Sequence, residues 1–343
     1  MTDSPKYFIV RARSRVPFRH GPLPLITGLA RMGFHQYKNR WAKRLGKRIG
    51  RLAFDTGYRL GLGGCGAVDL MKPDGPARLT FDARKHHYAS LYLNHYRDGY
   101  EPEVAALLET FLTDARVFYD VGSNWGYFAF YAATKPGYEG FIHAFEPVPQ
   151  TFADLMDWVI QADLAARITC HRLALSDESG TGVMAVDSET SGLARLVEGN
   201  TRDGGEAVTL ARVDDLDLPQ PDVLKIDVED HELNVLRGAR SVLATRKPML
   251  IFENWLVPQD RDSTLAPLRF LKEAGYFLFQ PLWRFVDGRF LWPKPHRPLP
   301  HGDRVLAMVP FVSDDRFSMR DQVNVFACHR DRLNELGEVF DSA

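Results

Sequence analysis

The chain has 343 residues, of which 45% are apolar and 25% are charged, as is ordinary for a globular protein. No apolar run approaches the ~20 residues that span a bilayer. Arginines also interrupt the segment from Arg11 to Arg19, where a signal peptide would need an apolar stretch. The three cysteines are far apart and odd in number, which excludes a disulfide framework and a cysteine metal motif. We therefore expect a cytoplasmic protein.

The first sixty residues are strongly basic, although the whole chain has a net charge of −1. They hold 14 Lys and Arg residues but only two acids. Apolar residues recur there at helical spacing, at Phe34, Tyr37, Trp41, Leu45, Ile49 and Leu52. This pattern predicts a basic amphipathic helix within residues 31–54. The helix either contacts an anionic membrane surface or glycolipid from the cytoplasmic side, or docks on the main domain with its basic face in water.

The rest of the chain predicts a hairpin followed by alternating strands and helices. Residues 68–71 and 78–81 flank the turn sequence Lys72-Pro73-Asp74-Gly75-Pro76. We then expect strands at 117–121, 141–145, 168–172, 223–226, 249–252, 276–280 and 323–328, and helices at 102–112, 127–133, 151–160, 232–244 and 265–274. This alternation predicts an α/β fold with a doubly wound, mostly parallel sheet. Residues 176–213 break the rhythm and indicate a short hairpin with a mobile loop.

A glycine turn follows the strand that ends at Asp120, in the sequence Asp120-Val121-Gly122-Ser123-Asn124-Trp125-Gly126. In a doubly wound sheet, ligands bind at the carboxyl ends of the strands. The spacing is neither the dinucleotide motif G-x-G-x-x-G nor a triphosphate P-loop. It suits a ligand with a carboxylate and a ribose. The amino group of this ligand would lie beside Asp120. Glu146 ends the next strand, where a ribose-binding carboxylate would fall. The alternative is that the glycines only form a tight turn and bind no ligand.

A second polar segment ends the buried strand at 223–226, in the sequence Asp227-Val228-Glu229-Asp230-His231-Glu232. We expect this strand to lie beside the glycine-turn strand, so that its carboxylates face the reactive end of a cofactor. Asp227 could accept a proton from an attacking hydroxyl or orient it. Glu229 and His231 could share that role or hold a metal, although we assign no metal ligands. Asp230 and Glu232 are better explained as acids that favour a helix N-terminus.

These segments occur in a characteristic order. The order is Phe118–Gly126, Phe145–Pro147, Ala174–Asp177 and Lys225–Glu232, and Tyr100–Val104 and Leu236–Ala239 match as well. Together they resemble the FkbM-type methyltransferases, which have the Rossmann-like class I fold and use S-adenosyl-L-methionine. The resemblance covers roughly residues 98–330.

The resemblance implies a set of cofactor-binding residues. Gly122, Asn124 and Gly126 would hold the methionine moiety, Glu146 would bind the ribose hydroxyls, and Leu175 and Ser176 would lie against adenine. The full expected set is Glu101, Asp120, Gly122, Ser123, Asn124, Gly126, Glu146, Leu175, Ser176 and Asp227. Two residues depart from the family pattern, because Asp230 stands where the family often has Gly and Val148 stands where it often has Asn.

We therefore expect two regions, a basic helical and hairpin extension over residues 1–97 and a methyltransferase domain over residues 98–343. The expected reaction is O-methylation of a hydroxyl, on a sugar of a glycan or glycolipid or else on a polyketide-like metabolite. A late exposed strand could support a homodimer. We expect no nucleic-acid partner, since no base pocket is evident.

Two rival hypotheses remain open. One is an oxidoreductase that binds a nicotinamide cofactor at an unusual glycine turn. The other is a non-catalytic module that keeps the fold and works through its basic helix. Binding of S-adenosylhomocysteine compared with NADH separates these hypotheses.

Overall fold

The computed structural model describes most of the chain beyond residue 64 and scattered parts before it. The described residues are 7–11, 14–20, 24, 27, 49–50, 52–53, 55–57, 59–61, 64–83, 85–93, 96, 98–114, 116–185, 195–197, 205–293, 302–319, 322–336 and 338–340. The expected basic helix within residues 31–54 lies outside them, except for residues 49, 50, 52 and 53. No helix of the described part is long and apolar enough to cross a membrane.

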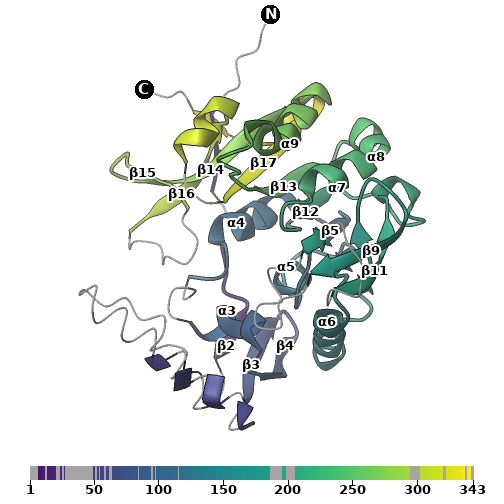
Figure 1. The fold of residues 1–343 in the computed structure, drawn as a ribbon. Coiled ribbons are helices and arrows are strands. Elements are labelled where there is room, and N and C mark those ends of the chain that lie inside the picture. The colour runs from purple at the N-terminus through teal and green to yellow at the C-terminus, as the bar shows by residue number, and fades with distance from the viewer. Residues whose placement is uncertain are drawn as a thin grey trace, which may run out of the picture.

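Five parallel strands form the core of the main sheet (Figure 1). They are β5 (Phe118–Val121), β6 (Ile142–Phe145), β7 (Ile168–His171), β12 (Val223–Ile226) and β13 (Met249–Asn254). Their order across the sheet is β13-β12-β5-β6-β7. The chain runs from β5 outward to β7 and then returns to β12 on the other side of β5, so the order reverses between β5 and β12. Ligands of open α/β sheets bind at such a switch point.

The other half of the main sheet is antiparallel. Beyond β13 lie β17 (Val323–His329), β14 (Tyr276–Phe285), β16 (Arg304–Pro310), β1 (Tyr7–Val10) and β18 (Glu338–Phe340), and β15 (Phe290–Leu291) pairs with β14. The expected α/β class is confirmed, with a parallel core inside a mixed sheet. The first strand, β1, belongs to this sheet although it precedes residue 97, and the division of the chain at residue 97 stays a prediction.

Helices cover both faces of the parallel core. On one face lie α4 (Pro102–Phe111), α5 (Tyr127–Ala133) and α6 (Pro149–Gln161), and on the other lie α7 (Glu232–Gly238), α8 (Arg240–Thr245) and α9 (Arg261–Glu273). Because strand side chains alternate between faces, Phe118 packs into the first layer and Tyr119 into the second. β5, β6, β12 and β13 are buried along their whole length and therefore read as near-continuous apolar runs, whereas the edge strand β7 is partly exposed.

The N-terminal extension contributes a separate three-stranded antiparallel sheet. It consists of β2 (Phe18–His20), β3 (Cys65–Lys72) and β4 (Gly75–Asp82), followed by η1 (His86–Tyr88) and α3 (Ala89–Tyr92). The expected hairpin is confirmed, since Lys72 pairs with Gly75 across its turn. The sheet packs on α6, where the Trp158 indole Nε1 donates a hydrogen bond to the Thr80 carbonyl at 2.9 Å.

The irregular segment after β7 forms a second small sheet. Its strands are β8 (Ala174–Leu175), β9 (Gly180–Ala185), β10 (Arg195–Val197) and β11 (Glu206–Ala211), in the order β10-β9-β11-β8. The expected hairpin is present as β9, β10 and β11. Three short 3-10 helices complete the described fold, η5 (Val213–Asp215), η6 (Ser313–Ser318) and η7 (Arg330–Leu336).

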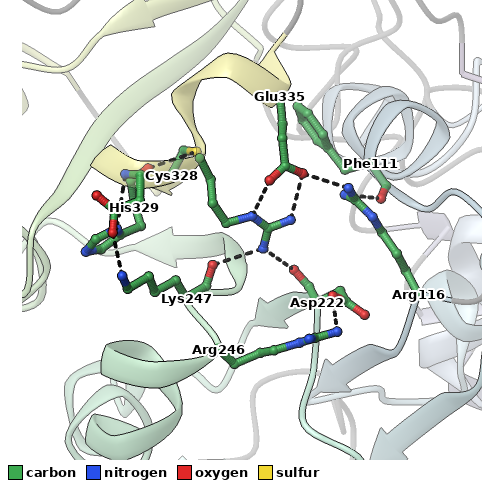
Figure 2. A network of polar contacts seen from close by, with 10 residues as sticks. Phe111, Arg116, Asp222, Arg246, Lys247, Cys328, His329 and Glu335 are labelled. Atoms are coloured by element: carbon green, nitrogen blue, oxygen red, sulfur yellow. Dashed lines mark hydrogen bonds and ion pairs between the residues drawn. The ribbon is translucent and has the colours of Figure 1, made fainter.

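A charged network closes the amino ends of the parallel strands, and we call it the amino-end network (Figure 2). The Arg332 guanidinium donates to both carboxylate oxygens of Glu335, at 2.7 and 2.9 Å. Arg116 also donates to Glu335 at 2.7 Å, and Arg246 donates to Asp222 at 2.6 Å. Hydrogen bonds from Arg332 hold the pKa of Glu335 down at about 2. Every carboxylate in this set therefore has a cationic donor.

Candidate active site

The glycine turn is shaped by close contacts with its neighbours. Gly122, Asn124 and Gly126 all have positive φ, at 73°, 52° and 95°. A Cβ at Gly122 would lie 1.8 Å from the Asp227 carbonyl oxygen, and one at Gly126 would lie 2.5 Å from a Leu155 methyl carbon. Gly122 therefore lets the end of β12 cross the turn, and Gly126 lets α5 begin close to α6. Both requirements select glycine at these positions.

Glu146 is tied directly to this turn. Its carboxylate is buried and accepts hydrogen bonds from the backbone N–H groups of Asn124 at 3.0 Å and Val148 at 2.9 Å. Burial raises the pKa of Glu146 to about 7, although these two bonds oppose the shift. Each carboxylate oxygen keeps a second lone pair, which can accept from a hydroxyl of a ligand. The expected ribose-binding role is therefore compatible with this geometry and stays a prediction.

Lys225 joins the two sides of the switch point. The strand register sets Lys225 of β12 directly beside Asp120 of β5. The Lys225 ammonium lies 3.4 Å from Asp120 Oδ1 and 3.3 Å from Asp227 Oδ2, and it donates to the Gly122 carbonyl at 3.4 Å. Its side chain is only 5% exposed. Burial alone would lower the pKa of Lys225, but Asp227, Asp120 and Glu101 raise it above its ordinary value.

Asp120 depends on this lysine. Its side chain is fully buried and neither oxygen accepts a conventional hydrogen bond, so the ion pair with Lys225 is its main compensation among the described residues. Burial raises the pKa of Asp120, and Lys225 opposes that shift. Sequence reasoning did not single out Lys225. Its signal was a lone cation inside the apolar strand sequence Val-Leu-Lys-Ile, which predicts a buried partner.

Four carboxylates gather above Lys225, and we call Glu101, Asp227, Glu229 and Glu253 the acid cluster. One carboxylate oxygen from each of Asp227, Glu229 and Glu253 lies within 4.8 Å of the others. Oxygen ligands at such spacing could hold a divalent cation. Burial, and then the charge of Asp227, raises the pKa of Glu229 to about 8 and that of Glu253 to about 11. Burial likewise raises the pKa of Glu101 well above its ordinary value.

The backbone near this cluster is strained. Glu101, Glu229 and Asp230 all have positive φ, at 41°, 52° and 72°. Left-handed backbone at non-glycine residues costs energy and collects at functional sites. A positive φ of this size suits glycine, and Asp is among the side chains that tolerate it.

His231 does not join the acid cluster but contacts Ser176 instead. The His231 Nε2 atom lies 2.9 Å from the Ser176 hydroxyl oxygen. Burial lowers the pKa of His231, although Asp177 and Glu178 oppose the shift. His231 thus joins Ser176, which was expected on the adenine side, while Leu175 and Ser176 are both buried. His231, which was expected to be catalytic, is therefore in direct contact with Ser176, which was expected to lie against adenine.

Comparison with known proteins gives the family of the central region. Residues 117–278 match the family described as Methyltransferase FkbM domain. The chain is similar to the hexuronic acid methyltransferase AglP of Haloferax volcanii, with 32% identity over 155 residues. That match covers 42% of this chain, and the chain spans 58% of the relative.

Solved structures of low sequence identity were also found. The structure of methyltransferase FkbM from Methylobacillus flagellatus KT is 19% identical, with a TM-score of 0.38 over 57% of this chain and 44% of that one. A SAM-dependent O-methyltransferase from Thermotoga maritima is 12% identical, with a TM-score of 0.35 over 71% and 78% of the two chains.

The cofactor that this family implies is S-adenosyl-L-methionine, and the residues present fit it. The cofactor carries a sulfonium and an amino group, both positive. The switch point offers the acid cluster and Asp120, and among the described residues Lys225 is the cation that pairs with them. Glu146 adds a hydroxyl acceptor beside the glycine turn. Residues 117–278, which match the methyltransferase FkbM domain, therefore hold side chains that suit this cofactor.

Proposed function

We propose that the protein is an S-adenosylmethionine-dependent O-methyltransferase whose acceptor is a sugar hydroxyl of a glycan or glycolipid. The observation that carries the proposal is the contact of Asp227 with Lys225, directly across the switch point from the glycine turn. The name of the Haloferax relative, a hexuronic acid methyltransferase, supports a sugar acceptor. A uronic acid is the first acceptor class to test.

The bound cofactor supplies an electrophilic methyl group, and the protein supplies alignment and proton handling. Lys225 holds one carboxylate oxygen of Asp227, which fixes the side chain and leaves the other oxygen for an acceptor hydroxyl. In this proposal Asp227 orients that hydroxyl and accepts its proton. A positioned base of this kind contributes roughly 10²–10⁴-fold to the rate.

Asp227 is a better candidate for the base than Glu229 and His231, the two other residues expected to be catalytic. With pKa values raised to about 8 and about 11, Glu229 and Glu253 are largely protonated at neutral pH, so they donate hydrogen bonds rather than accept protons. His231 is engaged with Ser176. The proposal therefore keeps Glu229 as a neutral wall of the acceptor pocket and gives His231 a role on the cofactor side.

The test is the variant Asp227→Asn, which keeps the shape of the side chain and removes its basicity. Binding of S-adenosylhomocysteine should change by less than roughly tenfold, while turnover of an accepted sugar falls by roughly 10²–10⁴-fold. Asp217→Asn is the matched control, because it makes the same change at an exposed position outside the acid cluster. Full turnover by Asp227→Asn would contradict the role given to Asp227.

Contact with an anionic membrane through residues 31–54 and a homodimer both stay predictions. A deletion of residues 1–55 would not test the first cleanly, because it would also remove β1 from the main sheet. It would also remove Arg15, which donates to the Thr134 carbonyl at 3.1 Å. Replacement of Lys43, Arg44, Lys47 and Arg48 by Gln tests membrane binding without that loss.

A further inference from the structure

A groove opens on the outer side of α7 and α9, next to the acid cluster. It encloses about 720 Å³, a volume within the ~300–1,000 Å³ range of sites for drug-sized ligands. Its walls come from α7, α9 and the segment that follows β13. Because no residue of the glycine turn lines it, the groove is separate from the expected cofactor site.

The groove adjoins the candidate active site at Trp255. This residue lines the groove, and its indole Nε1 donates a hydrogen bond to Glu253 Oε2 at 2.8 Å. Glu253 in turn belongs to the acid cluster with Asp227 and Glu229. Trp255 therefore borders both the groove and the acid cluster, which places the groove next to the hydroxyl that Asp227 would orient.

The walls combine aromatic side chains with acidic and basic side chains. Trp255 and Phe270 provide half-buried aromatic surface. Among the lining charges, Asp262 pairs with Arg269 at 2.8 Å, and Glu232 accepts from the Val228 N–H at 3.2 Å. Because several acids and two arginines line the groove together, its charge pattern selects neither a simple anion nor a simple cation.

Helix α9 adds a backbone acceptor to the wall. Pro267 lies inside this helix and lines the groove, and it has no N–H to donate to the carbonyl four residues earlier. That carbonyl belongs to Ser263, which also lines the groove and is exposed. Arg237 lies on the opposite wall, with half of its side chain exposed. The lining residues thus supply both hydrogen-bond donors and acceptors.

We propose that this groove binds the sugar rings that follow the methylated ring of an oligosaccharide acceptor. A pyranose ring presents C–H faces that pack on aromatic surface, and its hydroxyls both donate and accept, which matches this mixed wall. The inference rests on the proposed function. It assigns the groove a role in acceptor chain length and affinity, and not in cofactor binding.

The experiment is to block the groove without removing any of its contacts. Ala266→Arg places a long side chain at a half-buried lining position of α9, and Ala244→Arg is the matched control at an exposed helical position outside the groove. The probe is a printed array of neutral and uronic-acid-containing sugars of one to four rings. Calorimetry with S-adenosylhomocysteine checks that each variant keeps a folded cofactor site.

We expect Ala266→Arg to lose roughly tenfold or more in affinity for sugars of two or more rings, about 1.4 kcal/mol per tenfold. Its binding of single rings and of S-adenosylhomocysteine should match that of the wild type and of Ala244→Arg. Equal binding of long sugars by Ala266→Arg, or no preference of the wild type for longer chains, would overturn the inference. Failure of the proposed function is distinguishable, because the wild type would then not bind S-adenosylhomocysteine.

Discussion

The two ends of the parallel strands carry charged clusters that differ in how their acids are paired with cations. At the amino ends, Glu335 and Asp222 each receive a guanidinium, and the pKa of Glu335 is lowered (Figure 2). At the carboxyl ends, Asp120 and the acid cluster share Lys225, and the pKa values of Glu229 and Glu253 are raised. The first arrangement stabilises the fold. The second crowds acids around one lysine, which keeps Glu229 and Glu253 largely protonated at neutral pH, and a positively charged ligand would favour their ionised forms.

Removing Lys225, which pairs with two acids at the carboxyl end, should have the largest effect. Lys225→Met leaves Asp120 buried without its ion pair, and breaking a buried pair in this way costs about 3–5 kcal/mol. We expect a large loss of stability in chemical denaturation together with loss of activity. The double variant Lys225→Met with Asp120→Asn separates the causes, because it removes both charges.

The double variant should regain most of the stability but not the turnover, since Asp227 would still lack its anchor. If the double variant recovered full turnover, Lys225 would serve only to neutralise Asp120. If it recovered neither property, the ion pair would not explain the loss of stability.

Breaking the amino-end network should have a smaller effect, confined to stability. Arg332→Ala removes two hydrogen bonds to the Glu335 carboxylate and one to the Lys247 carbonyl. We expect a loss of about 2 kcal/mol, because bonds to charged groups contribute more than neutral ones. Affinity for S-adenosylhomocysteine, measured by calorimetry, should stay at the wild-type value. A changed affinity would mean that the two ends of the sheet are coupled.

The two ends should also respond to pH with opposite sign. Glu335 has a folded pKa of about 2, below its ordinary 4.5, so its stabilisation is present above pH 4.5 and is lost as the pH falls toward 2. Glu229 has a folded pKa of about 8, so its ionisation opposes folding as the pH rises from 4.5 to 8.

Glu229→Gln should therefore stabilise the protein at pH 8, by roughly 1–2 kcal/mol once solvent screening is allowed for. Glu335→Gln should destabilise it at pH 7 and flatten the acid limb of the stability curve. Urea denaturation at pH 3, 5, 7 and 8 measures both effects. A stability loss at pH 8 in Glu229→Gln would contradict the raised pKa of Glu229 in the folded protein.

The sequence predicted the parts of the site that local patterns encode. The turn from Gly122 to Gly126, Glu146 after the next strand and Asp227 after β12 follow from strand ends and glycine spacing, and the structure brings them to one switch point. Local patterns could not reveal the partner of Lys225, because that contact depends on the register between β12 and β5. The turn of His231 toward Ser176 likewise depends on how α7 packs on β8, where a Cβ at Gly238 would lie 1.9 Å from the Ser176 carbonyl.

The antiparallel half of the sheet was harder to predict for a similar reason. The expected strands at 276–280 and 323–328 correspond to β14 and β17, but their direction is set by long-range pairing. β1 takes its place only through its pairing with β16 and β18. Pairings between distant segments carry no local signal, so periodicity finds the strands but not their neighbours.

Calorimetric titration with S-adenosylhomocysteine, with NADH in parallel, tests the central claim most directly. The account predicts binding of S-adenosylhomocysteine alone, with a Kd of roughly micromolar order, about −8 kcal/mol. Binding of NADH alone, or of neither ligand, would contradict the assignment of the switch point as a methyl-donor site.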